Sequence, residues 1–311
     1  MKNNEEKKEY SAHVSVQKDD VLEAFQEFVA EDDLFVDLTF GAGGHTRAMA
    51  EMGETIKIIS FDQDPDALAN GRKILEANNL SHRVTLVDSN FEKYPQFFKD
   101  NPELFGSGAK GILMDLGVSS HHFDDLSRGF SFRGEAALDM RMNNREGQTA
   151  KDLVNELDVE ELELIFREYG EERFSARIAE EIVEKRETAP IETTKDLENI
   201  IFHCYPKKMR FGKTNPSTRC FQALRIAVNR ELDVLKDTIP GLVDSLCPYG
   251  KLAIISFHSL EDRIVKHTFK AIKSERDDVK ILTKRPLIPS EKEISNNPRS
   301  RSAKLRILMK I

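Results

Sequence analysis

The amino-acid sequence predicts an α/β fold, a doubly wound Rossmann-like sheet interrupted by an all-helical insertion. Three observations predict it. Short runs rich in β-branched residues alternate with helical patterns through roughly the first 120 residues, which is typical of parallel βαβ units. From about residue 148 to residue 205 only helical patterns occur, and strand patterns return after them. We therefore expect one α/β domain that contains a helical subdomain.

The first half of the chain supplies four strand candidates. These apolar runs lie at 34–37, 56–62, 83–88 and 111–115. Helical patterns precede or separate them, at 21–29, at 43–52 and from Pro65 to residue 79, and proline suits the first turn of a helix. This alternation predicts parallel strands that are buried on both faces.

The second half predicts the insertion and the end of the sheet. Apolar residues between 148 and 205 recur every three or four positions, as in amphipathic helices. One long amphipathic helix is predicted over 221–239 and another over 259–273, and three strands are predicted at 251–257, 279–283 and 303–311. The predicted domains are a first α/β part (1–124), a helical substrate-recognition subdomain (125–221) and a second α/β part (222–311).

Composition limits the class of protein. The chain has 311 residues, 39% of them hydrophobic and 32% charged, which fits a soluble protein of about two domains. No apolar run approaches the roughly 20 residues that span a bilayer, and the N-terminus MKNNEEKKEY is no secretory signal. We expect a cytoplasmic protein. Its three cysteines form no CxxC pair, and no histidine spacing indicates a metal, so we predict neither a disulfide framework nor a metal site.

The distribution of charge leaves room for a nucleic-acid partner although the net charge is -8. No acidic residue lies between Glu198 and Glu231, and none follows Glu293. Such segregated basic segments can bind phosphates locally. The RNA-binding candidates are Lys207, Lys208, Arg210, Lys213, Arg219, Arg299 and Arg301. The alternative is a solvated basic surface without a partner.

Four strand candidates end on an aspartate, namely Asp37, Asp62, Asp88 and Asp115. In an open parallel sheet, ligands bind beyond the carboxyl ends of the strands, where these carboxylates converge. The glycine-rich turn TFGAGGH (39–45) follows the first strand but lacks the third glycine of the GxGxxG dinucleotide motif. A rim of aspartates would repel a pyrophosphate and stabilise the sulfonium of S-adenosylmethionine. The pattern thus favours a methyl donor over NAD.

Nine segments carry a resemblance to a known family. They are DLTFGAGGHT (37–46), FDQDP (61–65), DLGVSS (115–120), RGFSF (128–132), LDMRM (138–142), YGEERF (169–174), TRCFQALRIAVNREL (218–232), ISFHSLEDRIVK (255–266) and NPRSRSAKLR (297–306). In this order they resemble the MraW-type family of bacterial small-subunit ribosomal RNA methyltransferases H, nearly end to end. The resemblance implies a class I methyltransferase sheet, mostly parallel with an antiparallel late strand. It also implies S-adenosylmethionine as cofactor and methylation of N4 of a cytidine in the decoding region of 16S rRNA.

The resemblance also implies the residues that bind the methyl donor. These are Gly43, Gly44, His45, Asp62, Phe91, Asp115 and His122. The chemistry of the side chains agrees, because Asp62 can accept both ribose hydroxyls and Phe91 can stack on adenine. The family usually has Gln at the position of His122, and often His at that of Asn215.

The catalytic candidates follow the fourth and fifth strands. Asp115, with the carbonyl of Leu116, can accept an N–H of the target amine and so localise its lone pair. His258, at the end of the fifth strand, is the second candidate. Phe130 or Phe132 would stack on the extruded base, or else pack in the core, and His13 is a candidate to close over the cofactor.

Two alternatives to the RNA methyltransferase remain open at this point. One is a small-molecule methyltransferase, which leaves the acid-free segment and the helical insertion without a purpose. The other is a non-catalytic RNA-binding assembly factor on the same fold. The predicted partner is 16S rRNA, as free RNA or within the small ribosomal subunit, with no membrane. The oligomeric state is open, a homodimer being one alternative.

Overall fold

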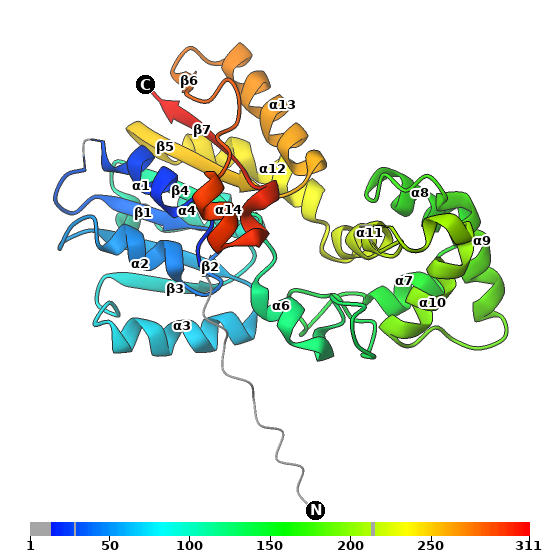
Figure 1. The fold of residues 1–311 in the computed structure, drawn as a ribbon. Coiled ribbons are helices and arrows are strands. Elements are labelled where there is room, and N and C mark those ends of the chain that lie inside the picture. Colours follow the sequence, from blue (N-terminus) through cyan, green and yellow to red (C-terminus); the bar gives the residue numbers. More distant parts are fainter. Residues whose placement is uncertain (1–13, 28, 213–214) are drawn as a thin grey trace, which may run out of the picture. The chain divides into compact units, whose positions relative to one another are not determined.

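The protein forms two compact units, which are seen in a computed structural model that describes residues 14–27, 29–212 and 215–311 (Figure 1). The sheet unit consists of residues 14–118 and 232–311, and the helical unit is Ser119–Glu231. The helical unit is therefore an insertion between two parts of the sheet unit.

Seven strands of the described residues form one sheet, in the order β3-β2-β1-β4-β5-β7-β6. Their bounds are β1 Leu34–Asp37, β2 Lys57–Asp62, β3 Val84–Asp88, β4 Ala109–Asp115, β5 Leu246–Ser256, β6 Val279–Ile281 and β7 Lys304–Lys310. The five neighbouring strands β3, β2, β1, β4 and β5 are parallel, whereas β7 is antiparallel to both β5 and β6. The predicted doubly wound, mostly parallel sheet with an antiparallel late strand is confirmed, and each strand candidate forms a strand.

Helices cover both faces of this sheet because successive strand residues point to opposite sides. Phe35 packs with α1 (Lys18–Gln26), α2 (Gly44–Ala50) and α3 (Pro65–Ala77). Its neighbour Val36 packs on the other face. The helices of that face are α4 Tyr94–Asp100, α5 Pro102–Phe105, α12 Glu231–Asp244 and α13 Ser259–Glu275. Burial on both faces explains the continuous apolar character of the strands.

The helical unit has a core of its own, which includes the fully buried Phe166 and Ile178. Its helices are α6 Ser120–Asp124, α7 Ala150–Glu156, α8 Val159–Glu168, α9 Ser175–Arg186, α10 Thr194–Cys204 and α11 Thr218–Asn229. Reciprocal capping boxes begin α7, α8 and α10 and satisfy their first amide groups. In the structure the unit comprises Ser119–Glu231, with α11 packed against α7 and α8. The predicted bounds of the substrate-recognition subdomain, 125–221, stay a prediction.

The long helix predicted over 221–239 is wrong in one respect, since the chain forms two helices there. Helix α11 ends at Asn229, and Arg230 adopts a left-handed conformation with φ of 50° before α12 begins at Glu231. The Asn229 side chain also donates to the carbonyls of Met140 and Arg225. A left-handed arginine carries no local sequence signal, and the apolar periodicity continues through it.

The longest helix among the described residues is α13, with 17 residues. None of the described helices combines the length and the apolar character that a bilayer crossing requires.

Candidate active site at the strand ends

Four aspartates occupy the last positions of the parallel strands β1 to β4, as predicted: Asp37, Asp62, Asp88 and Asp115. The register pairs Asp62 with Asp88, so the strands finish at the same edge of the sheet. Their environments differ. Asp37 is fully buried, Asp62 and Asp115 are partly exposed, and Asp88 is exposed.

Asp62 holds the glycine-rich turn that follows β1. Its Oδ2 accepts the amide of Gly41 at 2.7 Å, and its Oδ1 accepts the amide of Asp64 at 2.9 Å. Burial raises the pKa of Asp62 to about 7, against the effect of these two amides. A carboxyl group at the sheet edge with such a pKa changes charge near neutral pH.

Two glycines of the turn have no room for a side chain. Gly43 has φ of 72°, and a Cβ there would lie 2.6 Å from the Phe40 ring. At Gly44, the first residue of α2, a Cβ would lie 2.0 Å from Oγ of Ser15. The backbone of the turn therefore lies close to its neighbours, as a turn that approaches a ligand requires.

Asp37 serves the architecture of the turn. Its Oδ2 accepts the hydroxyl of Thr46 at 2.6 Å, and its Oδ1 accepts the amide of Thr39 at 3.1 Å. Burial raises the pKa of Asp37, and the nearby imidazole of His45 and the Thr46 hydroxyl oppose that rise. The side chain is thus committed to α2 and the turn.

Asp115 and His45 form a partly buried pair beyond β4. The Asp115 amide donates to the Thr39 hydroxyl at 2.8 Å, and Oδ1 accepts the amide of Gly117 at 2.9 Å. The other oxygen, Oδ2, lies 3.5 Å from Nε2 of His45. This Nε2 is buried without a hydrogen-bond partner among the described residues. A buried nitrogen in that state is a natural contact for a ligand oxygen.

Phe91 directly follows β3 and begins the short helix η1 (Phe91–Lys93). It is partly buried and packs on the edge of the sheet core. Nearby, the Asn90 side chain donates to Gln63 at 2.9 Å, which ties η1 to the loop after β2. The position and exposure of Phe91 suit the stacking that was predicted for it.

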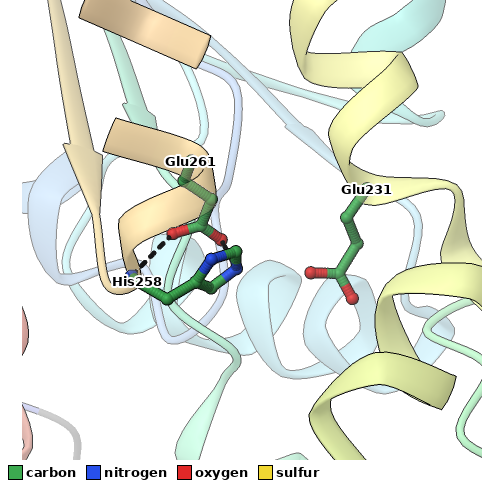
Figure 2. A group of neighbouring side chains, drawn as sticks. All are labelled: Glu231, His258 and Glu261. Carbon is green, nitrogen blue, oxygen red and sulfur yellow. Dashed lines mark hydrogen bonds and ion pairs between the residues drawn. The ribbon is translucent and has the colours of Figure 1, made fainter. Parts of the chain in front are cut away.

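His258 and Glu261 lie together where β5 leads into α13 (Figure 2). Nε2 of His258 lies 2.9 Å from Oε1 of Glu261. The other oxygen of this buried carboxylate, Oε2, accepts the amides of Phe257 at 2.7 Å and His258 at 3.2 Å. Sequence reasoning missed Glu261, although its place three residues after the N-cap is that of a capping glutamate.

Imidazole and carboxylate groups are also metal ligands. Two such groups make an incomplete ligand set, however, and the predicted absence of a metal stays a prediction. Glu231, also labelled in Figure 2, binds Arg225 within the helical unit through two hydrogen bonds of 2.8 Å.

The remaining pocket candidates belong to the helical unit. His122 is buried, and its ring stacks on Phe130 with the centroids 4.8 Å apart. Phe130 is itself buried, and Phe132 packs edge-on against Phe221 in the helical core. These contacts favour core packing for both phenylalanines over the predicted stacking on a base.

The basic candidates of the acid-free segment differ in how their charges are used. Lys207 and Lys208 are exposed on the short helix η3 (Lys207–Met209). Arg210 instead donates to the carbonyls of Tyr205 and His203 at the end of α10. Arg219 is exposed, and it donates to the carbonyl of Glu171. Among the described residues of this segment, the exposed Lys207 and Lys208 are therefore better placed for phosphates than the anchored Arg210.

The second basic segment lies in the sheet unit, in η4 (Pro298–Ser302) and β7. Arg299 and Arg301 are exposed, as a phosphate contact requires. Arg306 is buried and bound to Asp262 at 2.6 Å, with Lys304 at 3.6 Å from the same carboxylate. The candidates His13 and Lys213 lie outside the described residues.

Comparisons with known proteins identify the family. The model of the MraW methylase family matches residues 10–311. A protein of Nostoc punctiforme named ribosomal RNA small subunit methyltransferase H is 46% identical over 300 residues, which cover 96% of this chain and 94% of the relative. Proteins with the same name from Nostoc sp. and Heliobacterium mobile are 48% and 44% identical, covering 89% and 96% of this chain and 86% and 99% of theirs.

The match runs through the glycine turn, the strand-end aspartates, the helical unit and the late strands alike. The chain therefore belongs to the MraW methylase family, whose methyl donor is S-adenosylmethionine.

Proposed function

We propose that this methyltransferase methylates N4 of a cytidine in the decoding region of small-subunit (16S) ribosomal RNA. The name that its relatives carry supports the RNA substrate. The specificity for the N4 atom of a cytidine is inferred from the resemblance of the site motifs to those of the family. Such a substrate places the enzyme in the cytoplasm.

The donor site in this proposal is built on the turn after β1. Asp62 accepts the ribose hydroxyls, and Phe91 stacks on the adenine. Gly43 and Gly44 let the backbone approach the donor, and His45 offers its unpartnered Nε2 to the methionine carboxylate. The residues fit the donor because a positively charged sulfonium is stabilised by carboxylates. The predicted contact of His122 belongs to the helical unit and stays part of the proposal.

The catalytic proposal rests on the hydrogen bonding of Asp115. Its Oδ1 accepts the amide of Gly117, while Oδ2 lies 3.5 Å from Nε2 of His45. Oδ2, together with the carbonyl of Leu116, can accept an N–H of the cytidine amine. That bond orients the amine and localises its lone pair.

Bound S-adenosylmethionine supplies an activated methyl carbon on a good leaving group. Held by the turn after β1, it would supply this carbon to the amine nitrogen and leave with the electron pair on sulfur, while Asp115 would orient the amine. The nitrogen then loses one proton. Asp115 or His258 would accept this proton. Asp115 ends β4, and His258 comes two residues after the end of the adjacent strand β5, in which Ile255 pairs with Asp115.

The test is Asp115→Asn, which keeps the size of the side chain and an oxygen for the Gly117 amide. At a saturating concentration of methyl donor, we expect a loss of methyl transfer of about 10²- to 10⁴-fold, the range of general-base effects. Labelled methyl transfer to small-subunit RNA measures it, with a metabolite extract as the competing substrate.

Mass spectrometry of 16S rRNA from cells that lack the protein identifies the product. One missing methyl on a cytidine N4 supports the proposal. Methyl transfer to the extract alone would contradict it in favour of a small-molecule enzyme. If the 16S rRNA of cells with Asp115→Asn were the same as that of wild-type cells, the result would instead indicate an assembly factor.

A further inference from the structure

An exposed aromatic pair lies in the acid-free segment of the helical unit. Phe211 is 86% exposed, the highest value among the large apolar side chains of the described residues. Its ring meets that of Phe202, at the end of α10, edge-on with the centroids 5.7 Å apart. Neither ring is part of the hydrophobic core that the described residues of this unit form.

The fold holds this pair in place. The guanidinium of Arg210 lies over the Phe202 ring, 5.2 Å from its centroid. Arg210 is itself fixed by hydrogen bonds of 2.8 and 3.0 Å to the carbonyls of Tyr205 and His203. Phe211 therefore follows a residue that is anchored at the end of α10. Its exposed ring packs against Phe202, which in turn lies under the guanidinium of Arg210.

The chemistry around the pair is that of a nucleic-acid surface. Lys207 and Lys208 are exposed on η3, a few residues before Phe211. The chain has no carboxylate side chain from residue 199 to residue 230. Aromatic rings that alternate with cations bind single-stranded nucleic acid, because each base has an apolar face and each phosphate a negative charge.

We propose that Phe211 is a stacking platform for an unpaired RNA base, supported by Phe202 and Arg210, with Lys207 and Lys208 binding the adjacent phosphates. The inference rests on the proposed RNA substrate and adds a contact outside the methylation site. A base within a duplex has both faces covered, so the platform selects unstacked nucleotides.

The test compares Phe211→Ala with Phe211→Tyr, which keeps a stacking ring. The probe is an unpaired oligoribonucleotide of about 12 nucleotides, within the site sizes of single-strand binding proteins, with the same sequence in a duplex as the second probe. Fluorescence anisotropy gives the affinities without methyl donor. Leu164→Ala is the matched control, since Leu164 is a half-exposed apolar residue of α8 in the same unit.

We expect Phe211→Ala to weaken binding of the unpaired probe by about 5- to 150-fold, the equivalent of one stacked base. Phe211→Tyr and Leu164→Ala should bind like the wild type, duplex binding should not change, and neither should the salt dependence or the melting temperature. Equal affinity of Phe211→Ala and the wild type for the unpaired probe overturns the inference. So does an effect that appears only with assembled subunits, which would indicate a protein partner.

These outcomes are distinct from a failure of the proposed function. That failure would show as absent methyl transfer by the wild-type enzyme to any small-subunit RNA, whatever the affinity of Phe211→Ala.

Discussion

At the scale of single residues, the carboxylates at the strand ends divide the work between architecture and chemistry. Asp37 is committed to Thr39 and Thr46, whereas one oxygen of Asp115 lies 3.5 Å from Nε2 of His45, beyond hydrogen-bond distance among the described residues. Their position at the strand ends predicts that such residues lie close together. It does not predict which of them form hydrogen bonds with the turn. Burial and hydrogen bonding decide this, and both depend on neighbours that are distant in sequence.

If Asp62 binds the ribose as proposed, the binding of the methyl donor should depend on pH. Because burial raises the pKa of Asp62 to about 7, its acceptor oxygens and its negative charge are lost as the pH falls below that value. We expect donor affinity to increase about tenfold from pH 6 to pH 8, in proportion to the ionised fraction. Isothermal titration calorimetry over this range measures it.

Asp62→Asn is the control for that pH dependence, because the amide cannot ionise. Its affinity should be low at every pH and should not rise between pH 6 and pH 8. The raised pKa also means that the unliganded fold loses stability as the pH rises from about 4 to 7, since the unfolded carboxyl gives up its proton first. A wild-type affinity that is flat across pH 7 would contradict this role for the group.

At the scale of the elements, the strands and most helices could be predicted from the sequence because hydrophobic periodicity specifies them. The break between α11 and α12 could not. The apolar repeat continues through Arg230, and its left-handed φ of 50° reflects tertiary contacts such as Asn229 with Met140. Glu261 was missed for a different reason, since a local signal existed in its place three residues after the N-cap His258 and was overlooked.

Two kinds of basic residue that look alike in sequence lie after the end of α10. Lys207 and Lys208 are exposed, whereas Arg210 binds backbone carbonyls. Lys207→Ala and Lys208→Ala should each lower the salt dependence of RNA binding by a slope of about 0.7 and leave the melting temperature unchanged. Arg210→Ala should also destabilise the fold, by about 1–2 kcal/mol, because the carbonyls of His203 and Tyr205 lose their donor. Thermal unfolding and salt-dependent binding, measured on the same three variants, test this. Equal stability of all three would refute the difference.

At the scale of the whole molecule, each unit has its own hydrophobic core. The core of the helical unit draws on residues between Leu138 and Leu224, and the two clusters of the sheet unit contain none of them. A unit that buries its apolar residues internally satisfies the main requirement for independent folding. The sequence predicted such an insertion, but apolar periodicity does not reveal that the whole of α11 packs with α7 and α8 in this unit.

We therefore expect a fragment of residues 119–231 to fold alone and to unfold cooperatively in urea. Phe166→Ala should lower its free energy of unfolding by about 3–5 kcal/mol, because Phe166 is fully buried. Leu164→Ala, at a half-exposed position of the same helix, should change it by less than about 0.5 kcal/mol. Circular dichroism during urea titration follows the transition. A fragment without a cooperative transition would show that this unit needs the sheet.

The double engagement of Asp62 has a consequence for how this enzyme can evolve. One carboxylate fixes the Gly41 amide and is also the proposed partner of the ribose, so any replacement alters the shape of the loop and the recognition of the sugar at once. Selection cannot adjust these two traits separately at this position. Drift in nucleoside preference would then come from neighbours such as Phe91, the proposed contact of the adenine.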